Sequence, residues 1–344
     1  MSAYLNKYIK YKKKYIDLKN NIIQNGGQES IRIGINDKIL KKLFFPYLTT
    51  KYISLEDIDL ELIRANTFSN YENLISLSLK INKLTIITKD TFFGLSSLQT
   101  LFLDQNEIIS INKDSWNGLV ILQILHLNFN KIKSIGEKTF QSLSKLEFLY
   151  LNNNEIESID KEAFIGLSNL KNLQLSYNNI KTIKKDTFIE LSKLESLYLN
   201  NNNIESILAS AFTGLTNLKN LNLNNNKITT IDDNTLTGLD SLLVLEIDNN
   251  NITTISKGAF KNTKNLTELS LKNNNIININ DDIFTGLNYL VSLKLEGNQN
   301  IIIDKDICRN IRKLPKLNDE YRKNIYSKMN KLNKLKMLSL SGKC

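Results

Sequence analysis

A leucine recurs every 24 residues along most of the chain, and this period limits the possible folds more than any other feature of the sequence. It begins at Leu74 and returns without an insertion at positions 98, 122, 146, 170, 194, 218, 242, 266 and 290. Each unit reads L-x-x-L-x-L-x-x-N-x-I-x-x-I-x-x-x-x-F-x-x-L, and the fourth runs from Leu146 to Leu167. One such unit cannot bury its own apolar side, so units must stack. The period therefore predicts a solenoid of ten regular repeats.

Within each unit, the L-x-L alternation predicts a short strand with one buried face. Stacking would bring these strands together in a parallel sheet, roughly 4.8 Å apart. An asparagine follows the strand in every unit, and its side-chain amide can donate and accept hydrogen bonds for buried backbone groups. The ten asparagines are Asn82, Asn106, Asn130, Asn154, Asn178, Asn202, Asn226, Asn250, Asn274 and Asn298.

This pattern resembles the leucine-rich repeat in its 24-residue form with phenylalanine, and the resemblance covers residues 74–311. It implies an α/β solenoid, a horseshoe with a parallel β-sheet on its concave face, in which the repeated asparagines form a structural ladder. It also implies recognition of a partner on that concave face. A degenerate unit precedes the first regular one in phase, with Ile58 at the asparagine position, which indicates a terminal cap that stacks on one side only.

We expect four segments along the chain. Residues 1–27 are a basic, amphipathic helical leader, and residues 28–49 are a candidate N-terminal cap. Residues 50–313 are the solenoid of one degenerate and ten regular repeats, and residues 314–344 are a basic C-terminal segment with a truncated repeat. In this last segment, Leu314 and Leu317 are interpreted as staying in phase with the repeats.

The helical leader is predicted from its tyrosines, which alternate steps of four and three along one helical face, at Tyr4, Tyr8, Tyr11 and Tyr15. Its sequence resembles a leader found on many proteins of the giant DNA viruses that infect amoebae, and this resemblance implies a viral source. Gly26-Gly27 either ends the helix or is a processing site for a protease of viral type.

Positive charge is concentrated at the two ends of the chain. Residues 1–50 carry 10 basic and 3 acidic side chains (net +7), and residues 305–344 carry 12 and 3 (net +9). Residues 51–304 carry 23 and 29, net −6, so the +10 of the whole chain belongs to its ends. Such ends either hold nucleic acid or anionic membrane, or are solvated tails.

Neither a secretion signal nor a membrane span is evident in the sequence. The first 20 residues lack an apolar signal core of about 7 to 15 residues. No run of about 18 apolar residues occurs anywhere that could form a transmembrane segment. We therefore expect an intracellular protein that is not secreted, located in the host cytoplasm or the virion if it is viral.

The sequence offers no catalytic constellation. The sole histidine, His126, and Cys308 lie seven units apart, roughly 34 Å at the strand spacing, whereas catalysis needs about 3 Å. No Cys/His cluster suits a metal and no glycine-rich loop suits a phosphate. Carboxylates on the concave side, Asp104 and Asp248 among them, are interpreted as solvated surface groups. We expect no enzyme activity, no cofactor and no metal.

Aromatic residues cluster at the variable concave positions of the second to sixth units and are absent from those of the last four. Aromatic side chains are enriched in binding hot spots, so we predict one contact patch there. Its residues are Phe102, His126, Phe129, Phe148, Tyr150, Tyr177 and Tyr198. The alternative is an A/T-rich codon bias, which would instead scatter these residue types.

These observations predict a non-enzymatic module that binds a partner protein, a host protein if the chain is viral, through the concave face of the solenoid. The alternative is a structural or tethering protein, associated with a virion, whose basic ends hold nucleic acid or membrane. Phosphate contacts weaken steeply with salt and an aromatic protein interface does not, so salt dependence separates the two.

Overall fold

The computed structural model describes residues 34–35, 50–277, 279, 283–298, 314–319 and 322–323. The chain divides into two compact units, one up to Leu170 (unit 1) and one from Lys171 onward (unit 2). The predicted leader helix, nearly all of the candidate cap at 28–49, and Cys308 lie outside the described residues.

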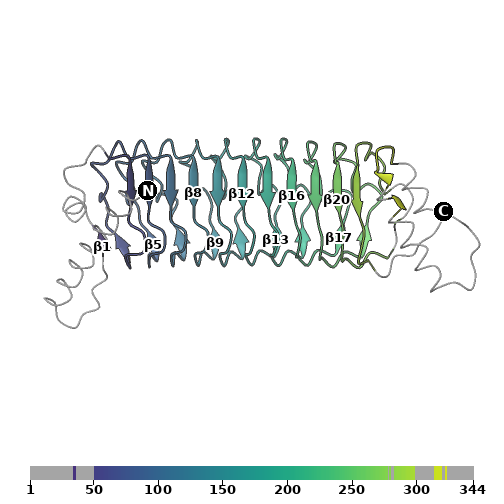
Figure 1. Ribbon diagram of the computed structural model, residues 1–344, viewed down its shortest axis with the longest axis horizontal. Coiled ribbons are helices and arrows are strands. Elements are labelled where there is room, and N and C mark those ends of the chain that lie inside the picture. The colour runs from purple at the N-terminus through teal and green to yellow at the C-terminus, as the bar shows by residue number, and fades with distance from the viewer. Residues whose placement is uncertain are drawn as a thin grey trace, which may run out of the picture. The chain divides into compact units, whose positions relative to one another are not determined.

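Unit 1 is built on a parallel sheet whose strands follow one another in chain order (Figure 1). Its long strands are β2 (Tyr52–Ser54), β4 (Ser76–Ser78), β6 (Thr100–Phe102), β8 (Ile124–His126) and β10 (Phe148–Tyr150). Two-residue strands alternate with them: β3 (Leu62–Ile63), which pairs with β1 (Gly34–Ile35), and the pairs β5 (Ile86–Ile87) with β7 (Ser110–Ile111) and β9 (Ser134–Ile135) with β11 (Ser158–Ile159).

Unit 2 repeats the same arrangement, with parallel strands that follow one another in chain order (Figure 1). Its long strands are β12 (Asn172–Gln174), β14 (Ser196–Tyr198), β16 (Asn220–Asn222), β18 (Val244–Glu246), β20 (Glu268–Ser270) and β21 (Ser292–Lys294). The short pairs are β13 (Thr182–Ile183) with β15 (Ser206–Ile207) and β17 (Thr230–Ile231) with β19 (Thr254–Ile255).

Strand pairing is in register at intervals of one repeat. Leu101 faces Leu125, and Leu197 faces Leu221, in each case 24 residues further along the chain. The middle residue of each long strand is buried, and the outer two point to the opposite side, which we call the sheet face of that unit. Equivalent positions of successive repeats therefore form straight rows across each sheet face.

The repeated asparagines are buried and bond to the backbone of two successive repeats. Asn154 Oδ1 accepts from the Ile132 N–H at 3.0 Å, and its Nδ2 donates to the carbonyls of Leu127 and Leu151 at 2.9 and 3.0 Å. In unit 2, Asn226 repeats all three bonds with the equivalent groups. These bonds satisfy polar groups that no water reaches, which is where a missing partner is most costly.

A second buried row is aromatic and fills the interior of unit 1. Phe68, Phe92, Trp116, Phe140 and Phe164 stack in sequence, with ring centroids 6.0 to 6.5 Å apart. In unit 2, Phe188 and Phe212 stack at 6.2 Å. The phenylalanine of the repeat therefore packs against its own copies and seals the side of the core away from the strands.

No helix occurs in residues 50–277, so the α part of the expected α/β class is wrong for these repeats, which form a parallel-β solenoid. Their connecting segments are turns with bonds three residues apart, such as Leu95 N–H to Phe92 O. Gly94 interrupts this turn with φ +95°, a conformation that stops helix growth. At Gly166, a Cβ atom would lie 2.4 Å from the Gln141 carbonyl oxygen, so only glycine fits.

The last described turn of unit 2 differs from the sequence prediction. Leu290 N–H bonds to Leu287 O, and Leu317 N–H bonds in the same way to Leu314 O. The Asn318 N–H bonds to Val291 O, one ladder step that spans 27 residues rather than 24. Leu314 and Leu317 are therefore three residues out of the predicted phase, and they occupy the buried positions of Leu287 and Leu290 in the next turn.

Candidate functional site

An aromatic stack crosses three neighbouring strands on the sheet face of unit 1. Phe102, His126 and Tyr150 are the last residues of β6, β8 and β10, and they pair in register. The ring centroids of Phe102 and His126 are 4.7 Å apart with 16° between the planes, and those of His126 and Tyr150 are 4.4 Å and 4°. Parallel strands lie about 4.8 Å apart, so the register itself places these rings at stacking distance.

A second apolar row lies beside the stack. Phe148 and Ile124 begin β10 and β8, pair with each other, and share the sheet face because they lie two residues before Tyr150 and His126. All four side chains are partly exposed. The stack therefore belongs to a wider apolar surface than its three rings.

The loop after each long strand adds exposed apolar side chains to unit 1 at strained positions. The residue before the ladder asparagine adopts a left-handed backbone, with φ of 56° at Ile81 and 55° at Phe129. These side chains are 44% and 50% exposed. A left-handed backbone at a bulky residue costs roughly 1–3 kcal/mol. Unit 1 therefore keeps two apolar groups in strained, solvent-facing positions where a polar residue would be more stable.

The charges near the stack are incompletely paired. Burial lowers the pKa of His126 below 6.5, and the Asp104 carboxylate opposes this only in part, so the imidazole is neutral at pH 7. Burial also raises the pKa of Asp104 above 3.8, with its own backbone N–H, His126 and Lys80 acting in the opposite direction. Asn128 favours the protonated imidazole, although its Oδ1 lies outside hydrogen-bonding geometry. Lys80 forms an ion pair with Glu56 at 3.5 Å.

The seven aromatic residues expected to form one patch are distributed over both units. Unit 1 holds Phe102, His126, Phe129, Phe148 and Tyr150. Unit 2 holds Tyr177, which is 56% exposed with φ 55°, and Tyr198, which pairs with Gln174 and Asn222. Direct ring contact joins Phe102, His126 and Tyr150 into the stack, and we take that stack as the centre of the candidate site.

The sheet face of unit 2 is a hydrogen-bonded polar network. Glu246 Oε2 accepts from Asn222 Nδ2 at 2.6 Å and from Asn224 Nδ2 at 3.2 Å. Asp248 Oδ1 accepts from Ser270 Oγ at 2.6 Å and from the Lys272 N–H at 2.7 Å. These polar groups bond to one another within the unit, so a partner would have to displace existing bonds to use them.

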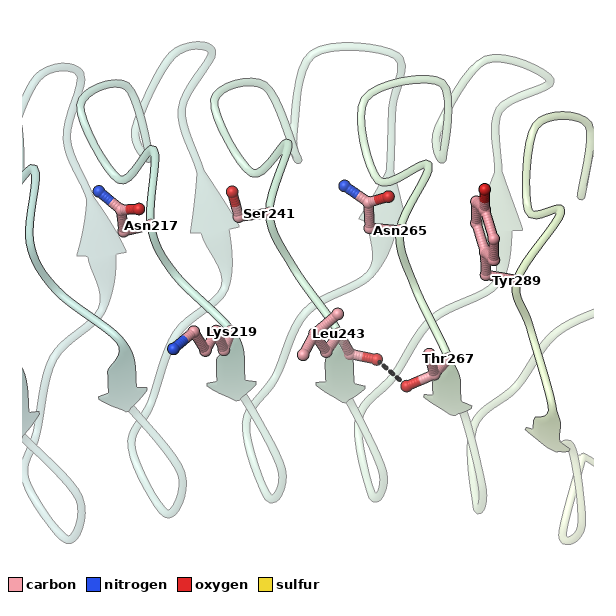
Figure 2. Close-up of a pocket in the computed structure, with 7 residues that line it drawn as sticks. All are labelled: Asn217, Lys219, Ser241, Leu243, Asn265, Thr267 and Tyr289. Atoms are coloured by element: carbon pink, nitrogen blue, oxygen red, sulfur yellow. Dashed lines mark hydrogen bonds between the residues drawn. The ribbon is translucent and has the colours of Figure 1, made fainter.

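A pocket of about 420 Å³ lies elsewhere on unit 2 (Figure 2). Its polar groups bond inward: Asn217 Nδ2 donates to Ser192 O at 2.7 Å, and Thr267 Oγ1 donates to Leu243 O at 2.9 Å. Lys219, on its wall, forms an ion pair with Glu195 at 2.9 Å. These polar groups of the pocket already bond within the chain, so the pocket is a weaker candidate for a binding site than the aromatic stack.

The described residues offer no group of three or more His, Cys, Asp or Glu side chains arranged to hold a metal ion. In the same part of the chain, none of the helical segments has the length and apolar character of a membrane span. The candidate site itself combines partly exposed rings with one carboxylate, Asp104, and one imidazole, His126.

The fold and the rows of variable side chains define a repeat solenoid that presents one sheet surface. The leucine-rich-repeat family matches residues 49–108, 96–156, 149–204, 192–252 and 240–299, so the chain belongs to that family. No curated protein matches the chain.

Solved structures share this fold. The chain is similar to TLR13 in its complex with ssRNA13, at 29% identity over 79% of this chain and 43% of that one, with a TM-score of 0.58. It is also similar to a leucine-rich-repeat protein of Leptospira interrogans, at 28% identity over 76% and 70%, with a TM-score of 0.61. The Drosophila Toll–Spatzle complex matches at 23% identity over 80% and 47%, with a TM-score of 0.55. The chain spans under half the length of the first and third of these.

Sequence reasoning missed three features of the site. Ile81 and Ile124 were not expected in it, and Asp104 was interpreted as a solvated carboxylate. The 24-residue register could have found Ile124, because it occupies the same repeat position as Phe148. The burial of the Asp104 Oδ1 atom has no signal in the sequence, since it depends on how the neighbouring side chains pack.

Proposed function

We propose that this chain is a non-enzymatic, intracellular protein-binding module whose partner docks on the sheet face of unit 1. The observation that carries the proposal is the stack of Phe102, His126 and Tyr150, with partly exposed apolar neighbours on the same face. Aromatic rings bury much area on binding at a low cost in side-chain entropy, which is why they dominate hot spots. Clustered exposed apolar groups on a soluble surface commonly mark interaction sites.

The strain at Phe129 and Ile81 supports the same surface. The left-handed backbone recurs at this position in the described repeats, and a bulky apolar residue tolerates it less well than asparagine does, so apolar side chains there are kept at a cost in stability. The strands that carry the polar network of unit 2, β16, β18 and β20, contain no aromatic residue. Among similar proteins, TLR13 forms a complex with ssRNA13 and Toll forms one with Spatzle, so related solenoids bind macromolecules.

The test compares two pairs of rings of equal size. Phe102→Ala with Tyr150→Ala removes both outer rings of the stack, and the control, Tyr177→Ala with Tyr198→Ala, removes two rings from unit 2. Proteins captured from a cell lysate are quantified by mass spectrometry, and the affinity of each for the full chain is then measured. We expect the first pair to lower affinity at least roughly 100-fold and the control to change it little. If only the control pair lowered the affinity, the proposal would be refuted.

A tethering role is the second candidate, and the observation that favours it is the charge at the two ends of the chain, +7 over residues 1–50 and +9 over residues 305–344. A tether that holds nucleic acid or anionic membrane through these ends must lose affinity steeply as salt increases. A salt titration of the full chain with the ring variants in parallel separates the two candidates, because deleting rings would leave a tether unaffected.

A further inference from the structure

Three buried polar atoms around the aromatic stack have no hydrogen-bond partner. They are Ser78 Oγ, Asp104 Oδ1 and Asn128 Oδ1. Ser78 pairs in register with Phe102, and Asp104 and Asn128 occupy equivalent positions two residues beyond Phe102 and His126. A buried polar atom without a partner costs roughly 1–3 kcal/mol. Packing at the stack therefore leaves two acceptor oxygens, Asp104 Oδ1 and Asn128 Oδ1, without a donor from within the chain.

The carboxylate of Asp104 also lacks a full countercharge. His126 is neutral at pH 7, and the nearest cation, Lys80, is held by Glu56. The four groups together carry a net charge of −1. In unit 2 the same repeat position is Asp248, whose Oδ1 receives two hydrogen bonds from within the chain. A carboxylate at this repeat position can therefore receive its hydrogen bonds from within the chain, as Asp248 does, whereas Asp104 Oδ1 receives none.

We propose that the aromatic stack and Asp104 together form the docking position for an arginine side chain of the partner protein. The guanidinium group is planar and permanently charged, so it can lie over the partly exposed rings and place its charge beside the Asp104 carboxylate, which is partly exposed. It also packs against aromatic rings more favourably than an ammonium group does. This assignment rests on the proposed function and adds the chemistry of the partner's anchor.

A nucleic acid fits these observations less well. Residues 51–304, which include the repeats, carry a net charge of −6, and the Asp104 carboxylate lies beside the rings. The phosphates of a nucleic acid would therefore approach a negatively charged part of the chain. Bases could stack on the exposed rings, but the backbone would be repelled. RNA is therefore an alternative outcome of the test.

The experiment uses the full-length chain and four pools of short peptides. Their flanking residues are randomised, and the central residue is fixed as arginine, lysine, glutamine or glutamate. We expect the arginine pool to bind roughly tenfold tighter than the glutamine pool, with the lysine pool between them. Asp104→Asn should abolish the arginine preference, and Asp240→Asn, the same change at an exposed site of unit 2, should keep it.

Equal binding of the arginine and glutamine pools to the wild-type chain, or no measurable binding of any pool, would overturn the arginine assignment. So would an arginine preference that survives Asp104→Asn. Single-stranded oligouridylate that binds more tightly than the arginine pool, and more tightly still to Asp104→Asn, would show a nucleic-acid site instead. The proposed function is tested by a different result. It would be wrong if the chain with Phe102→Ala and Tyr150→Ala still bound the lysate proteins as tightly as the wild type does.

Discussion

The two units use one repeat for surfaces of opposite character. In unit 1 the sheet face carries stacked rings, exposed apolar side chains on left-handed backbone, and a carboxylate whose Oδ1 has no donor. In unit 2, the strands beyond Tyr177 and Tyr198 carry carboxylates and amides that bond to each other in the equivalent rows. The interior asparagine bonds and buried leucines are the same in both. The repeat therefore separates folding, which depends on its fixed positions, from the chemistry of the sheet face, which depends on its variable positions.

The largest expected effect tests whether the interior really is equivalent. Asn154→Ala in unit 1 and Asn226→Ala in unit 2 each remove three hydrogen bonds to the backbone and leave the N–H of Ile132 or Ile204 without its asparagine acceptor. Each should lower the free energy of unfolding by on the order of 3 kcal/mol, measured by urea denaturation. The exposed Glu155→Ala should change it by under about 0.5 kcal/mol. Clearly unequal losses in the two units would mean that the difference extends into the core.

The next effect compares two aspartates at the same repeat position. Asp248→Ala removes the acceptor of two hydrogen bonds and should cost about 2 kcal/mol of unfolding free energy. Asp104→Ala removes a carboxylate whose ionised form is disfavoured by burial, so stability at neutral pH should stay constant or rise. If Asp104→Ala lowered the unfolding free energy as much as Asp248→Ala, the Asp104 carboxylate would have to receive stabilising hydrogen bonds from within the chain, as Asp248 does.

A smaller effect concerns the left-handed position before the ladder asparagine. Unit 2 has Asn225 there with φ 56°, where unit 1 has Phe129. Asparagine tolerates this conformation better, so Phe129→Asn should raise stability by on the order of 1 kcal/mol while weakening partner binding. The mirror change, Asn225→Phe, should lower stability by a similar amount. Calorimetry of both variants checks the pair, and a stabilising Asn225→Phe would contradict the strain argument.

The smallest effect is a pH dependence. Because burial lowers the pKa of His126 below its unfolded value of 6.5, the neutral form is the one that the fold favours. Its contribution to stability is present above about pH 6.5 and is lost as pH falls through the lowered folded pKa. The melting temperature should therefore fall between about pH 7.5 and about pH 5 more for the wild type than for His126→Phe.

In His126→Phe the stack is kept, and the facing groups Asp104, Lys80 and Asn128 are unchanged, so their own titrations cancel in the comparison. Identical pH profiles for the two chains would mean that the imidazole is no more buried when folded than when unfolded.

The repeated positions made most of the fold predictable. The 24-residue period gave strand order, register and the buried faces, because each repeat contacts its copies. The conformation of the connecting segments could not be predicted in the same way, because the three-residue spacing of Phe92 and Leu95 suits a helix as well as a turn. The phase of Leu314 was misread for a related reason: leucines three apart look alike, and the extra residues show only in the Asn318 bond to Val291.

The sequence predicted which residues of the site lie in one row, but not how their side chains stack or which of their polar atoms form hydrogen bonds. The row of Phe102, His126 and Tyr150 follows from the register alone, whereas the stacking angle depends on side-chain torsions. Asp104 and Asp248 are indistinguishable in the repeat pattern, and their different hydrogen bonding arises from their neighbours. Whether a carboxylate is free for a partner is a property of three-dimensional packing.

The in-register rows also determine how such a gene can change without losing its product. Unequal recombination that deletes residues 103–126 would remove one whole turn, reconnect Phe102 to Leu127, and set the rings of Phe102 and Tyr150 on adjacent strands. A deletion one residue shorter would leave one extra residue in a single turn, which the fold would have to accommodate as the last described turn accommodates three. Heritable gains and losses in units of 24 codons can therefore lengthen, shorten or rearrange the aromatic row, while the fold accepts each step as another identical turn.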